Sequence, residues 1–371
     1  MNILHLSTAR TWRGGEQQIV NLYKGLQNHI PSVQQHIICT KNSAMHRYCQ
    51  HHHLSHFPLT KAAPFNPLFA YHLWRISRRT NAHLIHCHDP HAQQFATIAA
   101  DIFGNFVPIV LSRRVDFPIQ NNWYSYYKYN HPQIKRIICV SDAIRQIITP
   151  TIRKSEKVCT VHSGIDFDRF DTATPNAASN LRQQYQIPAA TLLIGNVAAL
   201  ADHKDYFTFI DTAQILLEAG LNAVFLAIGE GEQRQVLQQY AQTKGVTDRL
   251  IFTGFRADIP QILPQLNLQL VTSKTEGLGT AVADAMYCRI PVVATAAGGI
   301  PELIEHGKTG LLAPVQDAPA LAKHVQQLLQ QKAWQQSMID NAYRKVVEHF
   351  SLQSMAKKTW QVYAEVVPDI R

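Results

Sequence analysis

The sequence predicts a chain of two doubly wound α/β domains, and three observations lead to that fold class. Its 371 residues exceed what a single hydrophobic core usually serves. Short, nearly continuous apolar runs alternate with helical stretches, which is typical of parallel sheets covered by helices on both faces. A polar, turn-rich stretch at about 171–187 interrupts the alternation and marks the expected domain boundary. Ligands are therefore expected at the carboxyl ends of the strands.

Residues 1–170 are expected to form the first domain and residues 187–350 the second. Each contains six apolar runs that we predict to be buried strands. In the first domain these runs lie at 3–7, 36–40, 84–87, 108–112, 137–140 and 158–162. In the second they lie at 192–197, 223–228, 250–253, 268–271, 291–295 and 309–312. A last helix is expected at about 352–366.

The excess positive charge is concentrated in the first part of the chain. Residues 1–170 contain 19 Lys and Arg against 8 Asp and Glu, a net charge of +11. Residues 171–371 contain 16 and 18, a net charge of −2. This asymmetry favours an anionic partner for the first domain: a membrane surface, a phosphorylated acceptor or both. Nucleic acid is the competing partner, but the basic residues are scattered and no nucleic-acid motif occurs, so we expect none.

The composition indicates an ordinary globular protein, 46% hydrophobic and 16% charged. There is no run of eighteen apolar residues, and the N-terminus enters a strand without a basic and apolar leader. The six cysteines show no metal or disulfide spacing and are expected to be reduced. Together with the basic first domain, these features predict a cytoplasmic protein, peripheral on the inner face of the cytoplasmic membrane.

The most informative segment is 273–302, where two carboxylates bracket a Gly-rich turn. It begins Ser-Lys-Thr-Glu276-Gly-Leu-Gly-Thr-Ala-Val-Ala-Asp284 and ends, after an apolar run, in a Gly-Gly-Ile-Pro-Glu loop. A helix is expected to begin at 279–280, where free backbone amides can bind a phosphate or a sugar hydroxyl. Asp284 falls one turn into that helix and can accept both hydroxyls of a ribose. The alternative is a polar loop with an acid that offsets the helix dipole.

This segment resembles the donor site of the GT-B fold retaining glycosyltransferases of family 4 (group 1), among them lipopolysaccharide core glycosyltransferases and phosphatidylinositol mannosyltransferases. The usual pattern has Glu at both carboxylate positions, whereas the second is Asp284 here. The resemblance implies two Rossmann-like domains facing across a cleft, with residues 352–371 packed back on the first. It also implies transfer with retained anomeric configuration from a nucleotide-diphosphate-sugar, without a metal or other cofactor.

By this resemblance the second domain binds the donor. Lys204 follows the strand at 192–197 and matches a lysine that grips the diphosphate, although a solvated surface lysine is the alternative. The neighbouring arginine position holds Ala199, and either His203 or Arg256 is a candidate replacement cation. Glu276 is expected to hold the sugar and to act in catalysis. The other expected donor-binding residues are Gly277, Leu278, Gly279, Thr280, Asp284, Gly298 and Gly299.

The first domain carries the expected acceptor site. Gly14, Gly15 and Glu16 follow its first strand at a helix start, where a Gly-Gly turn can reach a phosphate; a tight turn is the alternative. The stretch His-Cys-His88-Asp-Pro-His91-Ala is similar to the His-x-His-Glu-Pro-x-Ala stretch of phosphatidylinositol mannosyltransferases. That likeness implies a catalytic place for His88 between donor and acceptor, and an acceptor contact for His91. A capping or core role is the alternative for both.

Two further features suit an anionic acceptor. Arg113 and Arg114 follow another strand end, and their planar guanidinium groups suit a carboxylate or phosphate, unless they are simply solvated. The segment 122–129 is aromatic and basic, which predicts an acceptor groove, a membrane interface or part of the core.

The predicted activity is that of a hexosyltransferase. It would move a sugar from a nucleotide-diphosphate-sugar to a hydroxyl of an anionic, lipid-linked glycan, such as lipopolysaccharide or another cell-envelope polysaccharide. One alternative is a catalytically weak sugar-nucleotide-binding scaffold of a glycosyltransferase complex, which Ala199 and Asp284 favour. Another is a related sugar-nucleotide epimerase or phosphorylase, which the Gly-rich carboxylate motif fits less well than a transferase.

Overall fold

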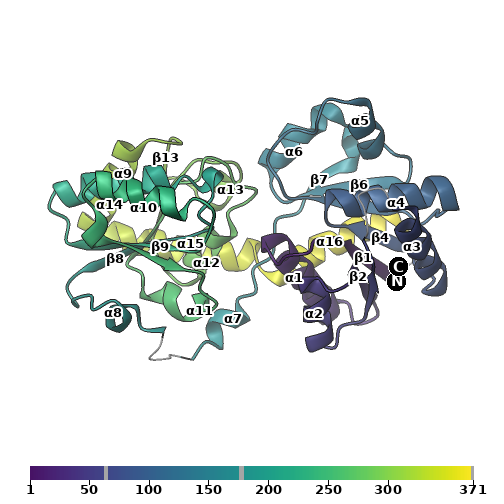
Figure 1. The fold of residues 1–371 in the computed structure, drawn as a ribbon, viewed down its shortest axis with the longest axis horizontal. Helices are drawn as coiled ribbons and strands as arrows, with labels where there is room; N and C mark the ends of the chain where they lie inside the picture. Colours follow the sequence, from purple (N-terminus) through teal and green to yellow (C-terminus); the bar gives the residue numbers. More distant parts are fainter. Residues whose placement is uncertain (62–65, 175–178, 369–371) are drawn as a thin grey trace. The chain divides into compact units, whose positions relative to one another are not determined.

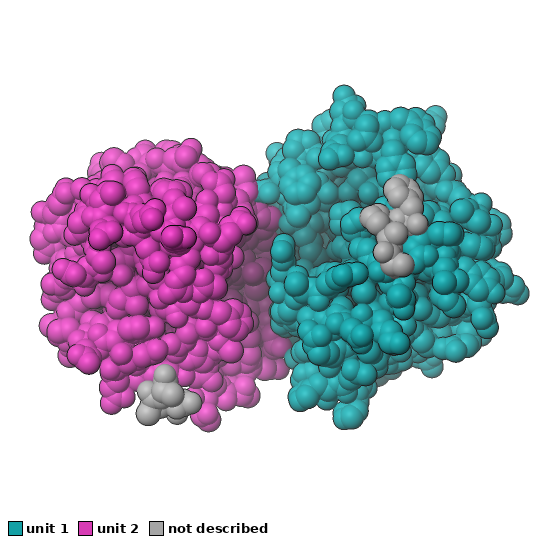
Figure 2. Space-filling view, viewed as in Figure 1, with its two compact units in different colours: residues 1–164, 352–371 teal, residues 165–351 magenta. Residues whose placement is uncertain are grey.

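The computed structural model describes residues 1–61, 66–174 and 179–368 and divides the chain into two compact units (Figure 1). Unit 1 contains Met1–Gly164 and Leu352–Arg371, and unit 2 contains Ile165–Ser351; Figure 2 colours the two separately. Unit 2 therefore begins before the turn-rich stretch in which the sequence analysis placed the boundary. Residues 175–178 of that stretch, and 369–371 of the C-terminal segment, lie outside the described residues.

Unit 1 is built on a parallel seven-stranded sheet with the order β3-β2-β1-β4-β5-β6-β7. Its strands are β1 (Asn2–Ser7), β2 (Gln34–Thr40), β3 (His56–Leu59), β4 (Leu84–Cys87), β5 (Ile109–Arg113), β6 (Ile134–Cys139) and β7 (Val158–Thr160). Its helices are α1 (Gly14–His29), α2 (Ala44–His51), α3 (Pro67–Arg79), α4 (Pro90–Phe103), α5 (Trp123–Tyr129), α6 (Asp142–Ile148) and α16 (Leu352–Val366). The strand order reverses between β1 and β4, where a doubly wound sheet opens a crevice for ligands.

All six strands predicted for this part of the chain are present, and β3 is a further strand that the sequence pattern did not predict. This strand is short, lies at the edge of the sheet and contains Pro58, which cannot donate to a strand ladder. Its apolar signal is weak because its residues are exposed or half-buried. The edge position explains why proline is tolerated there.

Helix α16, yellow in Figure 1, packs along α1 and completes the core of unit 1. Gly25 permits this close approach, because a Cβ there would lie 2.9 Å from the Leu352 carbonyl oxygen. Tyr363 and Ala356 are fully buried beside Leu26. The last helix is thus an integral part of the first unit.

Unit 2 contains a parallel six-stranded sheet with the order β10-β9-β8-β11-β12-β13. Its strands are β8 (Leu192–Val197), β9 (Ala223–Ile228), β10 (Leu250–Gly254), β11 (Leu268–Val271), β12 (Val292–Thr295) and β13 (Leu311–Ala313). Its helices are α7 (Asp168–Asp171), α8 (Leu181–Gln184), α9 (Tyr206–Glu218), α10 (Arg234–Thr243), α11 (Ile259–Ile262), α12 (Thr280–Tyr287), α13 (Ile300–Leu303), α14 (Ala318–Gln330) and α15 (Lys332–His349). The order reverses between β8 and β11. All six predicted strands are present, and α12 begins at the predicted residue.

In the part of the chain that the structure describes, no helix is both long enough and apolar enough to cross a membrane.

Candidate functional sites

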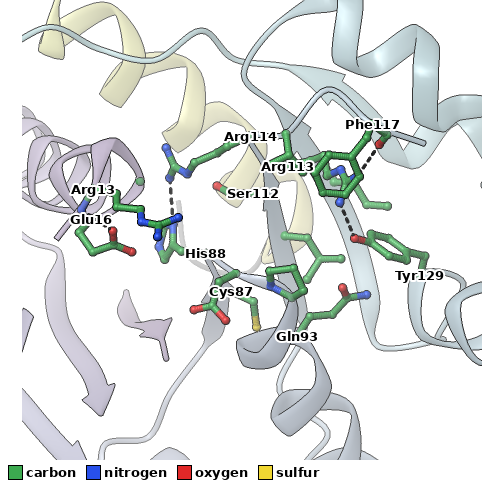
Figure 3. A pocket seen from close by; sticks show the side chains of 16 residues that line it. Arg13, Glu16, Cys87, His88, Gln93, Ser112, Arg113, Arg114, Phe117 and Tyr129 are labelled. Atoms are coloured by element: carbon green, nitrogen blue, oxygen red, sulfur yellow. Dashed lines mark hydrogen bonds between the residues drawn. The ribbon is translucent and has the colours of Figure 1, made fainter. Parts of the chain in front are cut away.

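Unit 1 contains a pocket of about 340 Å³ at the carboxyl ends of β4 and β5 (Figure 3). Five of the residues predicted for this domain line it, namely Gly15, Glu16, His88, Arg113 and Arg114. Gly14 and His91 do not line it, and His91 is exposed. The first turn of α1 therefore contributes to the pocket wall together with two strand ends.

The two adjacent arginines have different environments. Arg113 is buried and donates from Nη1 to the Tyr129 hydroxyl (3.0 Å) and from Nη2 to the Phe117 carbonyl (2.6 Å), so it holds the pocket rim. Arg114 donates from Nη2 to His88 Nδ1 (3.1 Å), and its buried Nε has no hydrogen-bond partner among the described residues. Burial lowers the Arg114 pKa to about 10, while Glu16 opposes that shift. Arg114 is therefore a protonated cation with spare donor capacity.

Arg13 and Asp89 are functional candidates that the sequence analysis missed. Figure 3 shows Arg13 with Glu16 and His88 on one side of the pocket. Asp89 accepts from Thr8 N (2.6 Å), Thr8 Oγ1 (2.8 Å), His91 N (3.0 Å) and Ala92 N (2.9 Å). It caps α4 and ties the end of β1 to the end of β4. Asp89, rather than His88 or His91, is thus the residue that caps the helix. The Asp-Pro pair at the helix start is the sequence signal that could have predicted this cap.

Three buried histidines, His5, His86 and His88, place ring nitrogens within 4.8 Å of one another beneath this pocket. Their ring nitrogens are occupied by hydrogen bonds within the protein. His86 meets the Tyr363 hydroxyl (2.5 Å) and Ser112 Oγ (2.8 Å), and His5 Nδ1 meets His88 Nε2 (3.1 Å). Burial is the largest cause that lowers all three pKa values, to about 4 for His5. The cluster is therefore a set of neutral, hydrogen-bonded imidazoles at pH 7.

In unit 2, Lys204 and Glu276 meet at the strand-order reversal between β8 and β11. Lys204 Nζ lies 2.5 Å from Glu276 Oε1, which also accepts from Ser273 Oγ (2.9 Å). The two side chains are 18% and 13% exposed. Thr272 Oγ1 donates to the Asp205 carbonyl (2.9 Å), so the loops after the two strands are joined. The structure thus brings together the two charged groups that we expected to serve the diphosphate and the sugar.

The Gly-Gly loop after β12 lies directly against Glu276. Gly299 N donates to the Glu276 carbonyl oxygen (3.1 Å), and a Cβ on Gly298 would lie 1.9 Å from that oxygen. Gly298 also has φ +50, a left-handed conformation that glycine adopts most readily. Glycine is therefore required here for close packing of two loops. Gly279 (φ +88) is the N-cap of α12, directly before Thr280.

The remaining predicted donor residues have partners of their own. Asp284 is buried and pairs with Arg169 (2.5 Å); burial raises its pKa and Arg169 lowers it. Arg256 donates to Asp258 and Gln184, and this pairing lowers the Asp258 pKa to about 2. Neither Asp284 nor Arg256 shares a hydrogen bond or an ion pair with Lys204 or Glu276 among the described residues. Gly277 is half-buried, and Leu278 is buried with the core.

Arg169 is a further charged residue that the sequence analysis did not single out. It belongs to α7, which is fastened to α12: Phe167 stacks on Tyr287 with ring centroids 4.1 Å apart, and the Tyr287 hydroxyl donates to Asp171 (2.7 Å). Arg169 and Asp284 lie 115 positions apart in the sequence, so no local sequence pattern could predict that they form an ion pair.

Comparisons with known proteins identify both halves of the chain. Residues 178–345 match the family model of the glycosyl transferases group 1, and residues 12–169 match that of the Glycosyltransferase Family 4. The N-acetyl-alpha-D-glucosaminyl L-malate synthase of Bacillus anthracis is 25% identical over 320 residues, covering 82% of this chain and 81% of that protein. The putative colanic acid biosynthesis glycosyltransferase WcaL of Escherichia coli is 29% identical over 202 residues, 52% of this chain and 47% of that one.

The fold also matches solved structures. The Anabaena protein Alr3699/HepE, crystallised with UDP and glucose, superposes with a TM-score of 0.84 at 21% identity, covering 98% of this chain and all of that one. Each sheet has a doubly wound strand order, and the Gly-rich carboxylate segment lies at a strand-order reversal. The chain is therefore a glycosyltransferase of the family 4, group 1 type with the GT-B fold.

Proposed function

We propose that the protein is a retaining glycosyltransferase that transfers a sugar from a nucleotide-diphosphate-sugar to a hydroxyl of an anionic, lipid-linked glycan in cell-envelope biosynthesis. In this reaction the bond from the sugar C1 to the donor phosphate oxygen breaks, and a bond from C1 to the acceptor oxygen forms. The acceptor proton leaves with the nucleoside diphosphate. Retention of configuration rests on the resemblance of the 273–302 segment to the retaining enzymes.

The observation that carries the proposal is the Arg114 guanidinium in the pocket of unit 1. Arg114 lines the pocket, and its guanidinium gives only the Nη2 bond to His88 among the described residues, so other N–H donors remain for a bound oxyanion. The net charge of +11 on residues 1–170 attracts the same kind of ligand. The Bacillus anthracis relative is named for L-malate, a dicarboxylic acid, and the Escherichia coli relative for colanic acid. Both names fit an acidic acceptor.

The donor half of the proposal rests on Lys204 and Glu276. The leaving diphosphate gains negative charge as the glycosidic bond breaks, and a nearby ammonium stabilises that charge. Glu276 holds Lys204 in place and keeps its second carboxylate oxygen, Oε2, for sugar hydroxyls. Asp284, with Arg169, is the proposed ribose contact. UDP is the first donor nucleotide to test, since the Anabaena protein of the same fold was crystallised with it.

The test is UDP release from a UDP-sugar in the presence of three kinds of vesicle. One kind carries lipopolysaccharide core, the second only anionic phosphatidylglycerol, and the third only neutral phosphatidylcholine. We expect release above background with the glycan-bearing vesicles alone, and ¹H NMR of the product should show the donor's anomeric configuration. Release that is equal in all three would be hydrolysis and would refute the acceptor class. An inverted product would refute retention.

A matched pair of variants locates the acceptor contact. Arg114→Gln removes the pocket cation, whereas Arg145→Gln removes one charge from an exposed ion pair with Asp142 elsewhere in unit 1. We expect the first to raise the KM for the anionic acceptor at least tenfold and the second to leave it within twofold. Equal effects would show that net charge, rather than the pocket, attracts the acceptor.

A further inference from the structure

A buried hydrogen-bonded chain runs from the pocket to the main chain of α1. Arg114 Nη2 donates to His88 Nδ1 (3.1 Å), as the dashed line in Figure 3 shows. His88 Nε2 meets His5 Nδ1 (3.1 Å), and His5 Nε2 meets Gln35 Oε1 (3.0 Å). Gln35 Nε2 then donates to the Tyr23 carbonyl oxygen (3.0 Å). His5, Gln35 and His88 are all buried, so water does not compete for these bonds.

The two ends of the chain fix the direction of every bond independently. A guanidinium can only donate, so His88 Nδ1 must accept and its proton must be on Nε2. His5 Nδ1 then accepts, and the His5 proton is on Nε2, facing the Gln35 oxygen. At the other end, a backbone carbonyl can only accept, so the Gln35 amide must present its NH₂ group to Tyr23 and its oxygen to His5. Both ends require the same two Nε2–H tautomers.

We propose that His5 and Gln35 are positioning residues for the pocket: they hold His88 in the Nε2–H tautomer, so that its Nδ1 fixes one edge of the Arg114 guanidinium and leaves the other donors for a carboxylate or phosphate of the acceptor. This inference rests on the acceptor role proposed above for Arg114. It assigns His88 to holding that cation rather than to accepting the acceptor proton, because both of its ring nitrogens are engaged.

The opposite tautomer would be costly. A proton on His88 Nδ1 would face the Arg114 N–H across 3.1 Å, leaving two donors opposed and without an acceptor. A second proton on the His5 or the His88 ring would likewise oppose two N–H donors. Burial lowers the pKa of both histidines, and His86 and Arg114 lower the His88 pKa further. The charged or ionisable groups that lower the His88 pKa after burial are His86, His5 and Arg114. The chain is consistent only with uncharged imidazoles.

A metal ion is the competing occupant of the His5, His86 and His88 cluster. It would need lone pairs from nitrogens that the chain uses for its own bonds, and it would lie beside the Arg114 cation. Three neutral imidazoles do not offset that repulsion, because none of them carries a negative charge. The hydrogen-bonded chain is the arrangement that these contacts favour.

The test compares two substitutions at one position whose side chains have the same number of heavy atoms and the same branching at Cγ. His5→Leu and His5→Asn both lose the contact with Gln35, but only asparagine places an amide oxygen near the position of Nδ1, where it can accept from His88 Nε2–H. Inorganic phosphate serves as the probe, and Arg114→Gln defines the part of its binding that belongs to the pocket. We expect His5→Leu to weaken this binding about tenfold and His5→Asn to restore it to within about threefold of wild type. Thermal melting should show both variants folded.

A second readout depends on neither acceptor nor catalysis. In full-length protein labelled with ¹⁵N-histidine, long-range ¹H–¹⁵N spectra should show His5 and His88 as Nε2–H tautomers, and His5→Leu should redistribute His88 towards Nδ1–H. An Nδ1–H tautomer for either wild-type ring would overturn the proposal. So would equal phosphate affinity in the two variants, no Arg114-dependent phosphate binding, or stoichiometric binding of Zn²⁺ to the three rings.

The failure of the proposed function would look different. Wild-type protein with the expected tautomers and Arg114-dependent phosphate binding, but without transfer to any anionic glycan, would refute the proposed acceptor class and leave the positioning chain intact.

Discussion

The contact between Gly298 and Glu276 allows a quantitative prediction for the proposed donor site. In Gly298→Ala the new Cβ lies 1.9 Å from the Glu276 carbonyl oxygen, and real Cβ atoms essentially never approach within 3.0 Å. Since both groups belong to backbone, one loop has to move by about 1 Å, a displacement that can lower the catalytic rate about 10²-fold. The left-handed φ of +50 adds about 1–2 kcal/mol of strain.

Gly307→Ala is the matched control for this prediction. Gly307 also has a positive φ (+79), but nothing lies within 4 Å of a Cβ built there. Gly307→Ala therefore also places alanine at a positive φ, but it causes no steric conflict and does not displace Glu276. The assay is UDP release at saturating donor, with thermal melting to show that both variants fold. We expect kcat to fall about 10²-fold in Gly298→Ala and less than threefold in Gly307→Ala. Equal activity in the two would refute the requirement for close packing of the Gly-Gly loop.

Two further predictions concern the charged groups. Lys204→Met should weaken UDP binding about 10–150-fold by calorimetry, because a charge-assisted contact contributes about 1.5–3 kcal/mol; unchanged affinity would show that Lys204 only holds Glu276. Burial lowers the His5 pKa from 6.5 to about 4, so the folded state resists protonation, and the stability that His5 contributes above pH 6.5 is lost as the pH falls towards 4. The loss should be about 2 kcal/mol between pH 7 and 5. Urea titrations at several pH values should show that the unfolding free energy of His5→Asn lacks this part of its dependence on pH. The same pH dependence in His5→Asn and in wild type would contradict the lowered His5 pKa.

Much of the fold could be predicted because buried parallel strands produce apolar runs that are readable locally. The carboxylate segment was equally readable, since Glu276 and the Gly-Gly loop combine charge with residues that permit close backbone contact. The edge strand β3 was missed because it is short, exposed and interrupted by Pro58. The bond between His5 and His88 spans 83 positions and has no local signature. Likewise, nothing near Asp284 in the sequence indicates that its carboxylate pairs with Arg169.

The placement of α16 has a consequence for the synthesis of the chain. The ribosome completes all of Ile165–Ser351 before it adds the helix that fills the core of unit 1. The Tyr363 hydroxyl, which bonds His86 beneath the pocket, arrives only with that helix. Unit 2 can therefore fold during translation while the first 164 residues still lack part of their core. A chain truncated at Ser351 should therefore carry a folded unit 2, whereas its first 164 residues, without α16, should be sensitive to proteases.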